Sequence, residues 1–194
     1  MNNSLSITKN RYGWMMAMVI VVSLFTQNVY GQKLKKYKFN NGTIAILLPK
    51  ELAPMTVEDM AYRYPSVRKP IASYTNETRE VDFSINISAT QWINEDLEIA
   101  QSFFKSSIIN LYDRVNFYQE GIEEISGKKF IVFEFDSYVR GTEGIEAIRK
   151  YTYVVYYIHN SKTIVFSFHT PFKEKEAWNY IADQVMKSIK IKKL

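Results

Sequence analysis

The chain has 194 residues, a formal net charge of +5 and no cysteine, and 46% of its residues are hydrophobic. This composition excludes an intrinsically disordered chain, a disulfide-stabilised scaffold and any chemistry that needs a thiol. A chain of this length has room for one domain with a sizeable core.

The first 31 residues have the layout of a signal peptide. Lys9 and Arg11 precede an apolar run at residues 14–25, and polar residues follow it. This run is shorter than the roughly 20 residues that span a bilayer as a helix. We therefore predict a leader at 1–31, cleaved between Gly31 and Gln32, and a mature chain without a transmembrane segment. The alternative is a leader retained as a signal anchor.

Residues 32–194 are predicted to form a single domain, periplasmic or secreted after export. Export of a chain without cysteine fits a bacterial envelope better than a eukaryotic secretory route. No internal repeat or low-complexity tract divides this part of the chain.

Positive charge is concentrated at the two ends of the predicted domain. One cluster comprises Lys33, Lys35, Lys36 and Lys38, the other comprises Lys187, Lys190, Lys192 and Lys193, and residues 39–186 are net negative. A nucleic-acid groove needs cations interleaved with aromatic residues on the body, so nucleic acid is disfavoured as a partner. We interpret the clusters as solvated ends, and the alternative is weak contact of these lysines with an anionic membrane or glycan surface.

The first predicted element is a β-hairpin at residues 35–49. Asn41 and Gly42 accept the positive φ angles of a tight turn between two strand-like runs. A short helix is expected next, because Thr56 with the carboxylate of Asp59 three residues later forms a capping box.

Pro65 ends this helix, since the residue before a proline is disfavoured in the helical conformation. Strands are predicted at 71–74 and 81–89, and in the second of these apolar and polar residues alternate. Such alternation is typical of a strand with one buried face.

A long helix is predicted at about residues 95–113, with Asn94 as its cap. Apolar residues recur at three- and four-residue steps along it, which indicates a stripe that faces the core. We expect both Phe103 and Phe104 in the core.

An antiparallel meander and a last helix complete the chain. The meander strands are expected at 116–125, 128–138, 145–159 and 163–170, and Pro171 is expected at the first position of the helix. The predicted fold class is α+β, with an antiparallel sheet of about six strands and helices packed on its faces, an α/β/α sandwich.

Short motifs accompany this order of elements: a hairpin that ends in a Leu-Pro step, then Tyr64-Pro65, Lys69-Pro70 and Tyr74-Thr75-Asn76. In these features the chain resembles the PsbP-like and DcrB-like group of bacterial α/β/α sandwiches. The resemblance covers most of residues 32–194 and implies a PsbP-like fold. It also implies a role in binding other proteins, because the group includes a photosystem extrinsic protein, a nuclear-import accessory factor and secretion chaperones. The motifs mark turns rather than chemistry, so no binding residue is transferred from the group.

Residues 60–77, MAYRYPSVRKPIASYTNE, are unusually rich in tyrosine, cations and proline. In one interpretation Tyr62, Arg63, Tyr64, Arg68 and Lys69 form a rigid patch that binds an acidic partner. In the other, the prolines punctuate a connection from helix to strand and the tyrosines bury their rings. We favour the connection.

The chain offers few candidates for catalysis, because it has two histidines and no nucleophile-turn motif. If a two-residue turn joins their strands, His159 lies at the turn and His169 lies opposite Thr152. The two rings are then roughly 20 Å apart and cannot share a metal ion.

Glu134 and Asp136 are the other unusual groups, because they interrupt a strand rich in Phe and Ile. We interpret them as partners of an ion pair across a hairpin that includes Arg149, rather than as an acid and a base. We therefore expect no catalytic residue, no metal and no cofactor.

Taken together, these features predict an exported, non-enzymatic accessory or binding protein of the bacterial envelope, with another envelope protein as its partner. The alternative is a carrier of a small ligand or lipid with a pocket between sheet and helix. A hydrolase is the third possibility.

Overall fold

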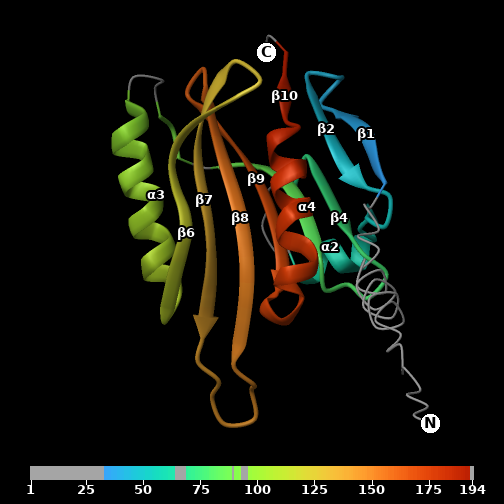
Figure 1. Ribbon diagram of the computed structural model, residues 1–194, viewed down its shortest axis with the longest axis vertical. Coiled ribbons are helices and arrows are strands. Elements are labelled where there is room, and N and C mark those ends of the chain that lie inside the picture. Colours follow the sequence, from blue (N-terminus) through green and yellow to red (C-terminus); the bar gives the residue numbers. More distant parts are fainter. Residues whose placement is uncertain (1–32, 64–68, 89, 93–95, 193–194) are drawn as a thin grey trace, which may run out of the picture. The chain divides into compact units, whose positions relative to one another are not determined.

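The computed structural model describes residues 33–63, 69–88, 90–92 and 96–192, and the predicted leader lies outside them (Figure 1). The described strands are β1 (Leu34–Phe39), β2 (Ile44–Pro49), β3 (Ala53–Pro54), β4 (Ala72–Thr75), β5 (Asp82–Ile87), β6 (Arg114–Ile125), β7 (Lys128–Val139), β8 (Ile148–His159), β9 (Lys162–Pro171) and β10 (Lys190–Ile191). The described helices are α2 (Val57–Arg63), α3 (Leu97–Leu111) and α4 (Lys175–Lys187), and a 3-10 turn, η2 (Phe172–Glu174), precedes α4.

Seven antiparallel strands form the large sheet, in the order β3-β4-β5-β9-β8-β7-β6. Successive side chains of a strand point to opposite faces, and the central parts of β7 and β8 are apolar at consecutive positions, so both faces of the sheet are buried there. The α+β fold class is confirmed. The sheet has one strand more than the estimate of about six, because Ala53 and Pro54 pair with β4 as a two-residue edge strand.

One face of the large sheet is covered by α4 and by the small sheet, which has the order β1-β2-β10 (Figure 1). Ile44 and Ile46 of β2 are almost fully buried and belong to the same core cluster as Phe83 of β5. Trp178 and Val185 of α4 belong to the same apolar core. Burial of this many large side chains is the main stabilising term of the fold.

Helix α3 covers the other face, over the β6–β7–β8 half of the large sheet. Its buried residues are Ala100, Phe104 and Ile108, and the Phe104 ring stacks on Tyr156 with 4.0 Å between centroids. The expectation for Phe103 was wrong, because 43% of this residue is exposed. Successive residues differ by 100° around a helix, so two adjacent phenylalanines cannot both face the sheet.

The turn predictions are confirmed by backbone geometry. Asn41 and Gly42 have φ angles of 55° and 81° between β1 and β2. Asn160 and Ser161 have φ angles of 49° and 56° in the two-residue turn between β8 and β9. Both pairs have the positive φ angles that match the twist of an antiparallel hairpin.

The ends of several elements differ from the predictions. The strand expected from residue 145 begins at Ile148, because the chain first makes an isolated bridge between Thr142 and Ile145. Pro171 ends β9 in an extended conformation and is not the first residue of a helix. A proline is tolerated there because it is the last residue of the strand, where the missing backbone N–H removes no hydrogen bond from the middle of the sheet.

Two predicted helix starts have different outcomes. The Thr56 hydroxyl accepts a hydrogen bond from the Asp59 N–H at 3.1 Å, which confirms Thr56 as the cap. The Asp59 carboxylate accepts from the same hydroxyl at 3.0 Å and not from the backbone N–H that a full capping box would use. Helix α3 begins at Leu97, and the predicted cap Asn94 lies outside the described residues. No helix among the described residues is long and apolar enough to cross a membrane.

Candidate functional site

A groove of about 630 Å³ lies on the α3 side of the large sheet, between α2 and the end of α3. Tyr62 and Arg63 of α2 line one side, and Tyr112, the residue that ends α3, lines the other. We call this feature the α2–α3 groove.

The groove exists because the strands beneath it carry polar residues on this face. In register across β8, β9 and β5, Thr152 lies opposite His169 and His169 lies opposite Asp82. On the other face of the same strands, Phe83 and Phe168 are fully buried. Small and polar side chains on the α3 side leave a depression where α3 no longer covers the sheet.

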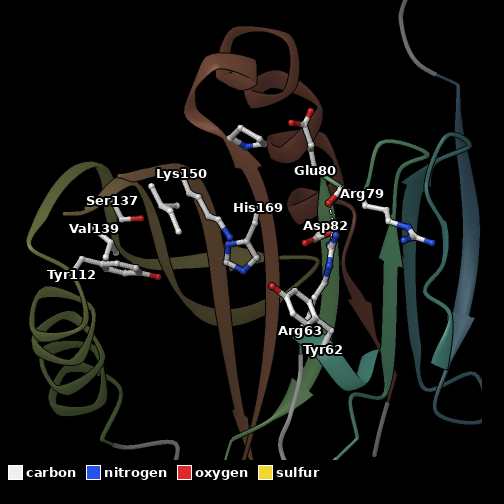
Figure 2. Close-up of a pocket in the computed structure, with 12 residues that line it drawn as sticks. Tyr62, Arg63, Arg79, Glu80, Asp82, Tyr112, Ser137, Val139, Lys150 and His169 are labelled. Carbon is white, nitrogen blue, oxygen red and sulfur yellow. Dashed lines mark hydrogen bonds and ion pairs between the residues drawn. The ribbon is translucent and has the colours of Figure 1, made fainter. Parts of the chain in front are cut away.

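Figure 2 shows His169 near the centre of the groove, with Lys150 beside it. The Thr152 hydroxyl lies 3.0 Å from Nδ1 of His169 and holds the ring in place. Burial, together with the positive charge of Lys150, lowers the pKa of His169 to about 4. His169 is therefore neutral at physiological pH, and Lys150 carries the charge at this point of the groove.

The other charged groups of the groove are paired. Arg63 donates to the Asp82 carboxylate and to the Arg79 carbonyl oxygen. Arg79 in turn lies 3.4 Å from an oxygen of Asp59. Lys150 has no carboxylate within ion-pair distance among the residues that the structure describes.

The side-chain hydrogen-bond partner of His169 is a hydroxyl and not a carboxylate. Within the described part of the chain, no carboxylate hydrogen-bonds to His159 or His169. The Asp82 carboxylate, next to His169 in the sheet, is bonded to Arg63 instead. A histidine base normally needs such an orienting partner and a pKa near the working pH. The described residues also contain no group of three or more side chains that could hold a metal ion.

The geometry predicted for the two histidines is confirmed. His159 pairs with Lys162 at the turn, and His169 lies opposite Thr152, seven residues away along β8. At about 3.3 Å per residue, the two histidines are roughly 20 Å apart.

The acidic pair on β7 has a structural explanation. Asp136 forms an ion pair with Arg149 at 2.7 Å, which confirms the predicted pair across the β7–β8 hairpin. Glu134 accepts a hydrogen bond from the Tyr151 hydroxyl at 2.8 Å, so its partner is a tyrosine and not Arg149.

The predicted patch at residues 60–77 is only partly within the described structure. Tyr62 and Arg63 line the groove, and Tyr62 is 88% exposed. Lys69 is exposed and is not among the residues that line the groove, whereas Tyr64 and Arg68 lie outside the described residues.

Sequence reasoning missed Lys150 and His169 as parts of this site. The available signal was weak: His169 and Ser167 take the polar positions of β9, and Asp82 and Ser84 those of β5. This pattern indicated that one face of these strands is polar. It did not indicate which part of that face the helices leave open to solvent.

The predicted lysine contacts come from two segments that meet in the small sheet. Lys35, Lys36 and Lys38 lie on β1, and Lys33 immediately precedes it. Lys190 lies on β10 and Lys192 follows it, whereas Lys193 is outside the described residues. The two clusters are therefore neighbours in space, because β1 and β10 pair with opposite sides of β2.

No family model matches the sequence, and no curated protein sequence matches it. Solved structures with the same arrangement of elements include PsbP (CyanoP) from Synechocystis sp. PCC 6803, at 14% identity and a TM-score of 0.58 over 85% of this chain and 96% of that chain. The chain has a PsbP/Mog1-like fold. The expected resemblance to PsbP-like proteins is thus confirmed for the fold, and the DcrB-like part of it stays a prediction.

Two further structures share this fold. The Ran-binding protein Mog1p of Saccharomyces cerevisiae has 13% identity and a TM-score of 0.54, over 83% of this chain and 96% of that chain. LpqN of Mycobacterium tuberculosis, described as involved in cell envelope biogenesis, has 9% identity and a TM-score of 0.52, over 83% of this chain and 91% of that chain. At these identities the similarity extends to the fold alone.

Proposed function

We propose that the protein is an exported, non-enzymatic accessory protein of the bacterial envelope and that it binds an acidic segment of another envelope protein in the α2–α3 groove. The observation that carries this proposal is Lys150, which lines a groove of about 630 Å³ and has no ion-pair partner among the described residues. A carboxylate of the partner would supply the missing counter-charge.

Exposed side chains at the rim support a protein partner. Tyr62 is 88% exposed, and Ile148 and Val139 are 47% and 39% exposed on the strands at the other side. Exposed tyrosines in a concave site often supply much of the binding energy of an interface. The Arg63–Asp82 pair keeps the end of α2 close to β5 and so fixes the rim before a partner arrives.

The structural neighbours support the same proposal at the level of the fold. Mog1p is described as Ran-binding, and LpqN is described as involved in cell envelope biogenesis. Accessory proteins that bind partners therefore occur on this fold, and so do proteins of the cell envelope.

Site-specific photo-crosslinking tests the proposal. A photo-reactive phenylalanine analogue at position 62 should crosslink one envelope protein in living cells when the full chain is expressed. The matched control is the same analogue at position 180, because Tyr180 is also exposed, at 65%, but lies on α4 on the other side of the large sheet. Equal crosslinking from both positions, or none from position 62, would overturn the proposal.

Charge reversal tests the role of Lys150 in the same assay. Lys150→Glu should reduce the crosslink from position 62 at least tenfold, because a carboxylate would then face the acidic segment of the partner. Lys162→Glu is the control, since Lys162 is exposed at the start of β9 and lies outside the groove. If both reversals had the same effect, the net charge of the protein and not the groove would govern binding.

Export is tested separately. N-terminal sequencing of the protein recovered from the envelope should give a start at or near Gln32. Recovery of an intact chain that begins at Met1 in the membrane fraction would contradict the cleaved leader and favour a retained anchor.

A carrier function is the second candidate, because the volume of the groove lies within the range of small-ligand pockets. Native mass spectrometry of the purified protein distinguishes the two. A bound lipid or small molecule that is lost in Lys150→Glu would favour the carrier, and an empty protein that crosslinks from position 62 would favour the accessory function.

A further inference from the structure

The small sheet brings together cations from the two ends of the described chain. Strand β2 lies between β1 and β10, as Figure 1 shows. Its register places Lys38 opposite Ala45 on one side and Lys190 opposite the same Ala45 on the other. Residues in register project from the same face of a sheet, so Lys38 and Lys190 flank Ala45 with Cα atoms about 10 Å apart.

Two further lysines extend this face. Lys36 lies two residues before Lys38 on β1, so its side chain leaves the same side of the strand. The N–H of Lys192 donates to the Thr43 carbonyl at 2.9 Å, which continues the ladder between β10 and β2 and places Lys192 on the side of Lys190. We call Lys36, Lys38, Lys190 and Lys192, all exposed, the lysine face.

The opposite face of the small sheet fixes the direction of the lysine face. Tyr37 of β1, Ile46 of β2 and Ile191 of β10 pack into the core against the large sheet. The lysine face therefore points away from the large sheet on its α4 side. Lys35 is two residues from Tyr37 on β1, so its side chain projects from the same face as Tyr37. Its ammonium lies 5.5 Å from the Tyr37 ring centroid, and Lys35 is therefore not part of the lysine face.

We propose that the lysine face docks the protein on the anionic lipid surface of a membrane. The strands β1, β2 and β10 contain no Asp or Glu, so no carboxylate on them opposes an anionic surface. Electrostatic attraction adds about fivefold to membrane binding for each lysine near such a surface, or several hundredfold for these lysines together.

The chemistry of this face favours lipid over other anionic partners. All its cations are lysines, which act as point charges for mobile headgroups, whereas fixed phosphates or carboxylates are usually held by the bidentate guanidinium of arginine. The residues in register with the lysines on β2 are Thr43, Ala45 and Leu47, so no aromatic ring is present there to stack on a base or sugar.

Docking by the lysine face is compatible with the proposed groove. The lysine face lies on the α4 side of the large sheet, and the α2–α3 groove lies on the α3 side. A protein bound to a membrane by its lysine face would thus present the groove away from the membrane, where a partner can enter it.

Vesicle binding of the full chain tests the inference. Affinity is measured for vesicles of phosphatidylcholine alone and for vesicles with phosphatidylglycerol added, and the ratio of the two affinities isolates the charge term. Lys9 and Arg11 of the leader contribute to this ratio equally in every variant, so a comparison between variants removes their contribution. We expect a clear preference for the anionic vesicles that falls as salt is added. Replacing all lysines of the lysine face by Gln should reduce this preference by at least tenfold.

The matched control removes the same number of charges from exposed positions elsewhere, Lys33, Lys35, Lys129 and Lys162. It should retain most of the preference. A smaller pair of variants repeats the test on one strand: Lys36→Gln with Lys38→Gln should weaken anionic binding several-fold more than Lys33→Gln with Lys35→Gln. Equal losses in variant and control would overturn the inference, because net charge alone would then explain binding.

The lysines have a competing structural role, since β1 and β10 are edge strands and lysines on edges oppose pairing between molecules. A variant of the lysine face that self-associates but keeps its preference for anionic vesicles would assign the lysines to edge protection and overturn the docking proposal.

Discussion

Arg149, whose side chain is about half exposed, forms an ion pair with the buried carboxylate of Asp136 across the β7–β8 hairpin. The Nε and Nη2 atoms of Arg149 donate to one carboxylate oxygen of Asp136 at 3.0 and 2.7 Å. The other oxygen accepts hydrogen bonds from the Tyr118 hydroxyl at 2.6 Å and the Asn116 amide at 3.2 Å. Asp136 is only 5% exposed, so these contacts replace nearly all of its hydration.

The first prediction is that Asp136→Asn lowers the free energy of unfolding by about 1–3 kcal/mol at neutral pH. The substitution keeps the volume of the side chain but removes the charge that the Arg149 guanidinium and the Tyr118 hydroxyl bind. Urea denaturation measures the change. Glu124→Gln on the exposed edge strand β6 is the control and should change stability by less than about 0.5 kcal/mol.

The pH dependence of this effect has a defined sign. Burial alone would raise the pKa of Asp136, but the hydrogen bonds from Tyr118, Arg149 and Asn116 and the charge of Arg149 outweigh it and hold the pKa below its ordinary value of 3.8. A lowered pKa stabilises the folded state above the ordinary value, and this stability is lost as the pH falls through the lowered pKa. The difference in the free energy of unfolding between wild type and Asp136→Asn should therefore be largest at neutral pH and should shrink in strong acid. A difference that grows on acidification would contradict this assignment.

The second prediction concerns His169, whose pKa is lowered to about 4 by burial and by Lys150. Between pH 6.5 and 4 the unfolded chain binds a proton at this position and the folded protein does not, so stability falls as the pH is lowered through this window. The loss amounts to at most about 1.4 kcal/mol for each pH unit. His169→Asn should flatten this part of the stability curve in urea titrations, even if the lost contact with Thr152 lowers stability at every pH. Parallel curves for wild type and variant would show that His169 does not carry the effect.

Local patterns predicted the hairpins because they depend on few residues. A two-residue turn at Asn160 and Ser161 fixes the register of β8 and β9, and that register alone places Thr152 opposite His169. The ion pair of Asp136 and Arg149 was also predicted within one hairpin, although it runs diagonally, because the register places Tyr151 opposite Asp136 and Tyr138 opposite Arg149. Each of these inferences joins residues that are close along the chain.

The candidate surfaces were not predictable because they join distant segments. The groove combines Arg63 of α2 with Lys150 of β8 and His169 of β9, and the lysine face combines β1 with β10. No local periodicity specifies which strand receives the last residues of the chain. The sequence therefore predicted the lysine clusters as two separate ends, and the structure shows them on one sheet.

The third prediction separates the adjacent phenylalanines of α3. Phe104→Ala should lower the free energy of unfolding by about 3–5 kcal/mol, because the Phe104 ring is buried and stacks on Tyr156. Phe103→Ala should cost about 1 kcal/mol or less, since its ring is partly exposed and packs only on its neighbours Trp92 and Phe104 among the described aromatic residues. Thermal and urea denaturation of both variants measure the difference. Equal losses would mean that α3 is rotated about its axis relative to the orientation described above.

The last prediction concerns the turn between β8 and β9, where Ser161 has a φ angle of 56°. A side chain in the left-handed region costs roughly 1 kcal/mol, and glycine avoids this cost but gains entropy in the unfolded chain. Ser161→Gly should therefore raise stability by a few tenths of a kcal/mol, up to about 0.5 kcal/mol.

The turn between β6 and β7 supplies the matched experiment, because Gly127 has a φ angle of 78° and a Cβ built on it meets no atom within 4 Å. Gly127→Ala should lower stability by about 1 kcal/mol through backbone strain alone. Urea denaturation of the two variants should thus give shifts of opposite sign. If Ser161→Gly were destabilising while Gly127→Ala behaved as expected, the Ser161 hydroxyl and not the backbone would decide the stability of its turn, since the two turns share the same backbone requirement.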